Sequence, residues 1–256
     1  MERWQSRVAV ITGASAGIGA VIAEDLVKAG LVVVALARRE TKLQERKQTL
    51  PVDLQTRYHP LKCDVTDEED VKKAFAWVEK NLGGTDILIN NAGVFYLGEN
   101  LTDSNSTEAI CKTLDTNVKA LAFCVREAFN SMKNRKFDGH VILINSIAGH
   151  TTERVSGANM YIPSKHAVTA MAQTYRHEFA HAGTKVKISS ISPGAVDTDL
   201  LPEYIKKMGI PILSPEDVSN AIQYVIATPP NVQIFELTIE PVRDKVINRS
   251  TLEQNK

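Results

Sequence analysis

The chain has 256 residues, 43% of them hydrophobic, and its 30 Lys and Arg residues are balanced by 30 Asp and Glu residues. This length is sufficient for one large domain with a full hydrophobic core, and the composition excludes a largely disordered chain. The zero net charge gives no electrostatic reason to expect nucleic acid or an anionic membrane as a partner. No apolar segment approaches the roughly 20 residues that are needed to cross a bilayer, so no membrane span is expected.

The cysteines and the amino-terminal segment bear on the compartment. Cys63, Cys111 and Cys124 are odd in number and form no C-x-x-C motif, which argues against a disulfide framework and against a zinc site. We therefore expect no bound metal and a reducing environment. Residues 1–7 are polar and lack the apolar segment of a signal peptide, so a soluble cytoplasmic protein is expected.

In chain order, short apolar runs alternate with longer amphipathic segments. Strands are predicted at residues 8–12, 31–37, 56–63, 86–90, 141–145, 185–191 and 234–239. Helices are predicted at residues 18–29, 42–50, 68–82, 107–133, 164–182 and 215–227. This alternation predicts a single α/β domain over residues 1–256, built as a Rossmann-like, doubly wound parallel sheet of about seven strands with helices on both faces.

Three local features complete this prediction. Thr66 and Glu69 have the spacing of a capping box at the start of helix 68–82. Residues 195–213 contain no clear strand and are predicted to form a mobile substrate lid with one short helix at 202–208. The polar tail at residues 243–256 is expected to fray.

A glycine-rich turn lies between the first predicted strand and the first predicted helix. Its glycines are spaced as in a dinucleotide-binding turn, where they permit a sharp strand exit, a close approach of pyrophosphate and close packing of helix on sheet. The amino terminus of the helix then offers unpaired N–H groups to the phosphates. The residues of this turn that we expect at a cofactor are Gly13, Ala14, Ser15, Gly17, Ile18 and Gly19. The alternative is a glycine-rich turn that binds no ligand.

The end of the second strand bears on the choice of cofactor. The acidic residue that would hold a ribose 2′-hydroxyl about 20 residues after the glycines is absent, and Arg38 and Arg39 stand there instead. A guanidinium group would pair with a 2′-phosphate through charge-assisted hydrogen bonds, to which the Ser15 hydroxyl could contribute. This favours NADP over NAD; the alternative is two solvated arginines at a strand end.

Two further strand ends are expected to contact the adenosine half of a cofactor. Asp64 and Val65 follow the third strand, where the Asp64 carboxylate could accept a hydrogen bond from the adenine amino group or, alternatively, cap the next helix. Asn91, Ala92 and Gly93 follow the fourth strand and can line the adenosine ribose. All of these residues come after strands, at the edge where open α/β sheets bind ligands.

A tyrosine and a lysine are candidates for proton transfer. Tyr161 and Lys165 are four residues apart, and therefore on one face of a helix. The lysine ammonium and a positively charged nicotinamide ring would favour the phenolate, so Tyr161 is a candidate base for alcohol oxidation and acid for carbonyl reduction. Lys165 would also hold the ribose hydroxyls of the nicotinamide. Chance Y-x-x-x-K pairs are common on helices, so the surrounding residues decide this assignment.

Three neighbouring segments supply that context. Ser146 ends the fifth strand and could bind the substrate oxygen beside the tyrosine. Asn117 lies in the middle of helix 107–133, where its carboxamide could bond a water that relays protons to the lysine. The segment after the sixth strand is expected at the nicotinamide, with a tight strand exit and a threonine hydroxyl. The residues expected there are Pro193, Gly194, Val196 and Thr198.

Taken together, these motifs resemble the short-chain dehydrogenase/reductase family from about Val8 to Val242. The resemblance implies a catalytic tetrad of Asn117, Ser146, Tyr161 and Lys165 and hydride transfer between NAD(P) and a substrate carbon. It also implies a homodimer or homotetramer that forms through the two long helices carrying the asparagine and the tyrosine.

Within that family, several segments resemble the insect farnesol dehydrogenases and the animal dehydrogenase/reductase SDR family member 11 group. These segments are 1–4, 24–30, 138–140, 145–150 and 191–194. This narrower resemblance implies NADP as the cofactor and a farnesol-type isoprenoid alcohol, or another small apolar alcohol or carbonyl compound, as the substrate. A 17β-hydroxysteroid dehydrogenase, a general carbonyl reductase and a non-catalytic NADP-binding regulator remain alternatives.

Two features depart from the usual family pattern. Pro163 stands between Tyr161 and Lys165, where many relatives have a small residue. Proline is tolerated in the first turn of a helix but would kink a helix that began well before Tyr161. The loop at residues 151–159 is also more polar than expected beside an apolar substrate.

Overall fold

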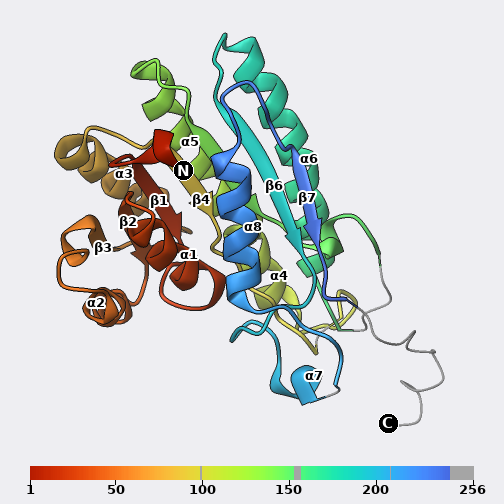
Figure 1. Ribbon diagram of the computed structural model, residues 1–256. Coiled ribbons are helices and arrows are strands. Elements are labelled where there is room, and N and C mark those ends of the chain that lie inside the picture. Colours follow the sequence, from red (N-terminus) through yellow and green to blue (C-terminus); the bar gives the residue numbers. More distant parts are fainter. Residues whose placement is uncertain (99, 153–156, 208, 243–256) are drawn as a thin grey trace.

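The computed structural model describes residues 1–98, 100–152, 157–207 and 209–242. Within these residues, seven parallel strands form one sheet in the order β3-β2-β1-β4-β5-β6-β7 (Figure 1). The strands are β1 (Val8–Thr12), β2 (Val32–Ala37), β3 (Tyr58–Lys62), β4 (Ile87–Asn90), β5 (His140–Ile144), β6 (Lys187–Pro193) and β7 (Glu236–Ile239). The predicted doubly wound α/β fold is confirmed, and its strand order reverses direction between β1 and β4.

Helices cover both faces of this sheet (Figure 1). They are α1 (Gly17–Lys28), α2 (Glu40–Thr49), α3 (Glu68–Leu82), α4 (Thr107–Leu114), α5 (Ala120–Asn134), α6 (Tyr161–His181), α7 (Glu203–Lys207) and α8 (Pro215–Ala227). Side chains of β1 alternate between two apolar cores: Ile11 packs with α1 and α8, whereas Val10 packs with α3, α5 and α6. The strand is apolar at every position because both of its faces are buried, as in other parallel sheets.

The predicted helix 107–133 is divided by a wide turn. A π-helical turn at Asp115–Lys119 (η3) separates α4 from α5, and Asn117 lies at its centre. Single π-helical turns inside α-helices often occur at functional sites. The sequence pattern predicts one continuous helix here, because a single widened turn has none of the capping or breaking residues that mark the end of a helix.

Helix α6 begins earlier than predicted, at Tyr161 rather than Ser164. Pro163 is therefore the third residue of the helix. The first four N–H groups of a helix have no intrahelical partner, so a proline at this position removes no hydrogen bond. The helix does not extend before Tyr161, and the kink considered above does not arise.

The amino terminus of α3 is capped differently from the prediction. Asp67 is the cap residue, and its Oδ1 accepts a hydrogen bond from the Glu69 backbone N–H at 2.9 Å. The Thr66 hydroxyl instead donates to Asp64 Oδ1 at 2.8 Å. The predicted Thr66–Glu69 capping box is therefore wrong, because the helix starts one residue later than a Thr66 cap requires.

The segment predicted as a lid is tied together at its base. Val196 and Leu213 form a parallel bridge, and the Leu213 N–H donates to the Ala195 carbonyl at 2.8 Å. Between them lies α7, whose Lys206 pairs with Asp197 at 2.8 Å. Residue 208, the last of the predicted lid helix, and the predicted tail at residues 243–256 lie outside the described residues. Among the helices of the described chain, none is long and apolar enough to cross a membrane.

Candidate active site

The glycine-rich turn lies at the switch point between β1 and β4. Gly13 has a φ of +66°, which glycine adopts without strain. A Cβ atom on Gly19 would lie 2.4 Å from Asn91 Nδ2 and 2.5 Å from the Gly13 carbonyl oxygen, so only glycine lets α1 approach this closely. The Thr12 hydroxyl accepts hydrogen bonds from the N–H groups of Asn91 at 3.0 Å and Ala92 at 2.9 Å. These contacts hold the two strand ends together.

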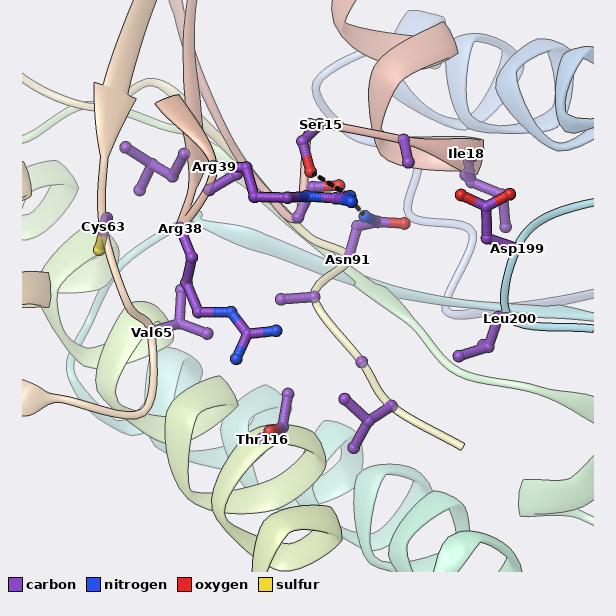
Figure 2. A pocket seen from close by; sticks show the side chains of 18 of the residues that line it. Ser15, Ile18, Arg38, Arg39, Cys63, Val65, Asn91, Thr116, Asp199 and Leu200 are labelled. Carbon is purple, nitrogen blue, oxygen red and sulfur yellow. Dashed lines mark hydrogen bonds between the residues drawn. The ribbon is translucent and has the colours of Figure 1, made fainter. Parts of the chain in front are cut away.

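A cavity of about 340 Å³ opens beside this turn (Figure 2). This volume lies within the range of small-molecule sites. Of the residues predicted to bind a cofactor, those that line the cavity are Gly13, Ser15, Gly17, Ile18, Arg38, Arg39, Asp64, Val65, Asn91, Ala92, Gly93 and Thr198. They come from the ends of β1, β2, β3 and β4 and from the base of the 195–213 segment.

Besides Tyr161 and Lys165, which are described below, five predicted cofactor residues do not line this cavity: Ala14, Gly19, Pro193, Gly194 and Val196. Ala14 is fully buried, and its N–H donates to the Leu36 carbonyl at 3.1 Å. Gly19 serves the packing of α1, and Pro193 ends β6. The Gly194 N–H donates to the Ile239 carbonyl at 2.8 Å, and Val196 forms the bridge with Leu213. In this structure these residues shape the backbone around the cavity.

The two arginines extend from the end of β2 into different parts of the cavity (Figure 2). Arg39 reaches back across the glycine-rich turn and donates from Nη2 to the Ser15 hydroxyl at 3.2 Å. Arg38 points toward Val65 and Thr116. Two guanidinium groups therefore line one cavity from two directions.

Asp64 also lines the cavity, but its carboxylate is partly engaged. Asp64 Oδ1 accepts hydrogen bonds from the Thr66 backbone N–H at 3.0 Å and from the Thr66 hydroxyl at 2.8 Å. The alternative that Asp64 caps α3 is wrong, because Asp67 does so. The carboxylate instead shapes the turn that leaves β3.

Several lining residues escaped the sequence analysis, among them Thr116, Asp199 and Leu200. Thr116 reaches the cavity from the π-helical turn, and its position next to Asn117 was the one available signal. Asp199 and Leu200 follow Thr198 and line the same cavity as Ile18 (Figure 2). Their approach depends on the path of the 195–213 segment, which no local pattern encodes.

Tyr161, Ser146 and Lys165 converge at the carboxyl end of β5. Ser146 follows β5, and its Oγ accepts a hydrogen bond from the Ala148 N–H at 3.1 Å. Lys165 Nζ donates to the Ile144 carbonyl at 2.9 Å and lies 5.7 Å from the centroid of the Tyr161 ring. A side-chain hydrogen bond joins Ser146 and Tyr161. The structure thus brings together three of the four residues predicted for proton transfer.

Burial controls the protonation of this group. It raises the pKa of the Tyr161 phenol above its ordinary value, while the hydrogen bond with Ser146 acts in the opposite direction. Burial also lowers the pKa of Lys165 to about 8. The expected lowering of the tyrosine pKa is therefore not produced by the protein's own groups, because the removal of the phenol from water outweighs them.

Asn117, the fourth predicted residue, is fully buried behind this group. Its Oδ1 accepts from the Val94 N–H at 2.9 Å, and its Nδ2 donates to the Val94 carbonyl at 3.0 Å and to the Ser164 hydroxyl at 3.0 Å. Both N–H groups of the carboxamide are thus used by protein atoms. A water relay from this side chain would have only the remaining lone pair of Oδ1, and it stays a prediction.

Comparison with known proteins agrees with this arrangement. Residues 7–209 match the family model of the short chain dehydrogenases. The chain belongs to the short-chain dehydrogenase family. As a member, it is an oxidoreductase, and its β1–α1 turn lines the cavity described above.

Similar members cover nearly the whole chain. A farnesol dehydrogenase of Aedes aegypti is 49% identical over 96% of this chain and 100% of its own length. Dehydrogenase/reductase SDR family member 11 of Mus musculus is 39% identical over 94% of this chain and 96% of its own. The narrower resemblance found in the sequence is thereby confirmed.

Solved short-chain dehydrogenase structures share the fold. The closed form of a serine dehydrogenase complexed with NADP+ has a TM-score of 0.83 and 29% identity, covering 94% of this chain and 97% of its own. An alcohol dehydrogenase from Thermococcus sibiricus complexed with 5-hydroxy-NADP has a TM-score of 0.81 and 25% identity, covering 94% and 99%. The described fold is therefore one on which nicotinamide cofactors have been seen in related proteins.

Proposed function

We propose that this short-chain dehydrogenase is an NADP-dependent oxidoreductase of apolar alcohols and carbonyl compounds, with a farnesol-type isoprenoid alcohol as its preferred substrate. The observation that carries the proposal is the meeting of Tyr161, Ser146 and Lys165 after β5. The ends of β1, β2, β3 and β4 in the same sheet frame a cavity that two arginines line. A non-catalytic NADP-binding protein would have no need of a buried lysine one helical turn from a hydrogen-bonded phenol.

The cavity has the features that NADP requires. Helix α1 begins at Gly17 with no side chain capping its N–H groups, so these groups remain available to a pyrophosphate. Arg38 and Arg39 would hold the 2′-phosphate, with the Ser15 hydroxyl already in hydrogen-bond contact with Arg39. NADP, when bound, supplies the hydride acceptor for alcohol oxidation, and NADPH supplies the donor for carbonyl reduction. NADP complexes of similar structures support this assignment.

The protein groups divide the proton chemistry between them. Tyr161 exchanges a proton with the substrate oxygen, and Ser146 holds that oxygen through its hydroxyl. A phenol with a raised pKa is protonated at neutral pH, which suits a proton donor in carbonyl reduction. Alcohol oxidation needs the phenolate, so its rate should increase with pH. Lys165 supports the phenolate electrostatically and would bind the ribose hydroxyls, while Asn117 fixes the backbone of Val94.

The substrate assignment rests on the similarity to a farnesol dehydrogenase and on the apolar side chain beside the phenol. The relative from Aedes aegypti is 49% identical over its full length. Within the described residues, the Phe95 ring contacts the Tyr161 ring at a centroid distance of 4.5 Å. An aromatic side chain against the phenol ring favours a hydrocarbon chain over a charged substrate.

A coupled absorbance assay tests the proposal directly. The purified protein is incubated with NADP and, in turn, farnesol, geraniol and steroid alcohols, and with NADPH and small diketones. We expect NADPH formation to be fastest with the isoprenoid alcohols. Fastest turnover of a steroid alcohol would identify a 17β-hydroxysteroid dehydrogenase instead. Fastest turnover of the diketones would identify a carbonyl reductase. Cofactor binding without turnover of any compound would indicate a regulatory protein.

Tyr161→Phe provides the matched variant for this assay. Loss of the proton-transferring hydroxyl should lower kcat by about 100-fold or more, because general acid–base catalysis contributes roughly 10² to 10⁴. NADPH affinity, measured by fluorescence titration, should change little since the ring and its packing remain. An unchanged kcat would overturn the assignment of Tyr161.

We further propose a cytoplasmic homodimer or homotetramer. The free cysteines Cys63, Cys111 and Cys124 support a reducing compartment. The oligomer is supported by an aromatic groove between α5 and α6 whose lining includes Phe123, Phe129, Tyr175 and Phe179. Phe123, Phe129 and Tyr175 are partly exposed there, and aromatic side chains are enriched at protein interfaces.

A further inference from the structure

Phe95 packs directly against the candidate catalytic tyrosine. The two ring centroids are 4.5 Å apart and the ring planes are inclined by 40°. As whole residues, Phe95 and Tyr161 are half-buried. On another side of the phenol, Ser146 bonds the hydroxyl and Lys165 Nζ lies 5.7 Å from the ring centroid. Phe95 thus supplies an apolar contact to a phenol that also has polar contacts with Ser146 and Lys165.

The backbone that carries Phe95 is fixed on both sides. Before it, the Val94 N–H and carbonyl are both hydrogen-bonded by the Asn117 carboxamide, at 2.9 and 3.0 Å. After it, the Gly98 N–H donates to the Gly157 carbonyl at 2.9 Å, which joins this loop to the segment that precedes Tyr161. The Phe95 ring is therefore held against Tyr161 by a braced backbone.

The Asn117 carboxamide is also linked by hydrogen bonds to the backbone of Tyr161. Asn117 Nδ2 also donates to the Ser164 hydroxyl at 3.0 Å, and that hydroxyl donates to the Tyr161 backbone carbonyl at 2.7 Å. One carboxamide thus fixes the start of α6 and the loop that bears Phe95 at the same time. Any shift of the Phe95 loop relative to α6 would break these bonds.

We propose that Phe95 is a positioning and specificity residue: it holds the Tyr161 phenol toward Ser146 and forms the wall against which the first carbons of an apolar, unsaturated substrate pack. The proposal rests on the proposed alcohol dehydrogenase function. A substrate oxygen that bonds both Tyr161 and Ser146 must bring its neighbouring carbons to the rim of this ring pair. A planar, unsaturated carbon next to the carbinol can lie flat on an aromatic face, whereas a tetrahedral carbon presents hydrogens that keep it farther away.

Kinetic comparison of two closely matched alcohols tests the specificity. Geraniol has a double bond next to its carbinol, and citronellol lacks that double bond. Phe95→Leu should lower kcat/KM for geraniol about tenfold and for citronellol threefold or less, with part of the geraniol loss in KM. Phe95→Tyr, which keeps the ring, should retain both values within about twofold. An equal loss on the two alcohols, or no loss on either, would overturn the specificity claim.

Trp77→Leu serves as the control for the loss of an aromatic contact. Trp77 packs on His59 at a centroid distance of 5.7 Å, on the edge strand β3 and α3. This variant removes a ring–ring contact of similar geometry away from Tyr161. Its ratio of geraniol to citronellol activity should equal that of the unmodified protein, and a changed ratio would show that the effect of Phe95→Leu is not local.

A measurement without substrate or cofactor separates this inference from the proposed function. The Tyr161 phenol is titrated by NMR with ring-labelled tyrosine and is assigned through Tyr161→Phe. Burial raises the pKa of Tyr161, so Phe95→Ala should move it downward by exposing the ring to water, while Trp77→Leu should not. If the unmodified protein oxidises no alcohol, the proposed function fails, yet this titration still decides whether Phe95 positions Tyr161. An unchanged titration in Phe95→Ala would overturn the positioning role.

Discussion

At the scale of single residues, Arg38 and Arg39 occupy neighbouring positions but act in different places. Arg39 crosses the glycine-rich turn to Ser15, whereas Arg38 points toward Val65 and Thr116 (Figure 2). Both side chains are exposed, so their charge is available to an incoming anion. A 2′-phosphate could be met by both guanidinium groups at once, and this distinguishes NADP from NAD.

Replacement of these arginines should therefore change cofactor choice. Arg38→Ala combined with Arg39→Ala should weaken NADPH binding by about 10- to 100-fold, because hydrogen bonds to charged groups contribute about 1.5–3 kcal/mol. NADH binding should change by less than about threefold, since NADH has no 2′-phosphate. Fluorescence titration with both cofactors measures the two affinities. Equal affinity for NADH and NADPH in the unmodified protein would contradict the assignment of NADP. Arg7→Ala, which removes an arginine at the other end of β1, is the control and should leave both affinities unchanged.

The buried Lys165 ammonium should affect stability in a defined pH interval. Burial lowers its pKa to about 8 in the folded chain, against about 10.4 for an exposed lysine. Between these values the unfolded chain binds a proton that the folded chain has released, so this group makes the folded state more stable as the pH rises. Below about pH 8 both states are protonated, and the full cost of burial is present.

Urea unfolding at about pH 8 and pH 9.5 measures this effect. From pH 8 to pH 9.5, the free energy of unfolding of the unmodified protein should rise by up to about 2 kcal/mol more than that of Lys165→Met. Each pH unit in this interval contributes at most about 1.4 kcal/mol. The comparison with Lys165→Met removes the contribution of other titrating groups. A constant difference between the two proteins across this interval would show that Lys165 is not held in a low-polarity site.

At the scale of secondary-structure elements, the start of α3 is a place where the sequence pattern and the structure name different capping residues. Thr66 and Glu69 match a capping box, yet Asp67 makes the hydrogen bond to the Glu69 N–H. Asp67→Ala should lower the free energy of unfolding by about 1 kcal/mol, the usual contribution of an N-cap. Thr66→Ala should cost less, because its hydroxyl bonds Asp64 outside the helix. Urea unfolding of the two variants decides between them, and a larger loss for Thr66→Ala would contradict the observed cap.

The elements with the clearest local patterns were the most predictable. Strand β1 and helices α3 and α8 have the predicted bounds, and β4 and β5 differ from theirs by no more than one residue at either end. Uninterrupted apolar runs are typical of strands that are buried on both faces. Boundaries that depend on tertiary contacts were missed by two or three residues. Helix α6, for example, begins at Tyr161, where the Ser164 hydroxyl bonds the Tyr161 carbonyl. Asn117 in turn bonds that hydroxyl from 47 positions away in the chain.

The residues of the candidate site likewise fall into those that local spacing predicts and those that depend on contacts between distant segments. Gly13, Arg39 and Tyr161 could be assigned from local spacing, because a turn or one helical turn fixes their relations. Asp199 reaches the cavity only through the path of the 195–213 segment, and Phe95 meets Tyr161 only because two loops are braced together. Such contacts between distant segments leave no periodic pattern in a single sequence.

At the scale of the whole molecule, the two faces of the sheet are covered unequally. Helices α1 and α8 pack closely over one face. On the other face, α5 and α6 leave an aromatic groove in which Phe129 and Phe179 stack at 4.2 Å and Tyr175 lies 5.9 Å from Phe179. Phe123 and Tyr175 are partly exposed at this groove, with the charged Arg126 and Glu178 beside them. A second copy of the chain would bury these rings and pair the charges.

Tyr175→Glu should therefore shift the protein from an oligomer toward a monomer. A carboxylate at the centre of an aromatic contact would lose its hydration without a matching partner, and the loss should exceed 100-fold in the dimer dissociation constant because buried unpaired charges cost several kcal/mol. Sedimentation velocity at micromolar concentration measures the change. Tyr224→Glu is the control, since Tyr224 is 65% exposed on α8, on the opposite face. A monomeric unmodified protein, or a Tyr175→Glu variant that stays assembled, would show that this groove does not hold a second copy.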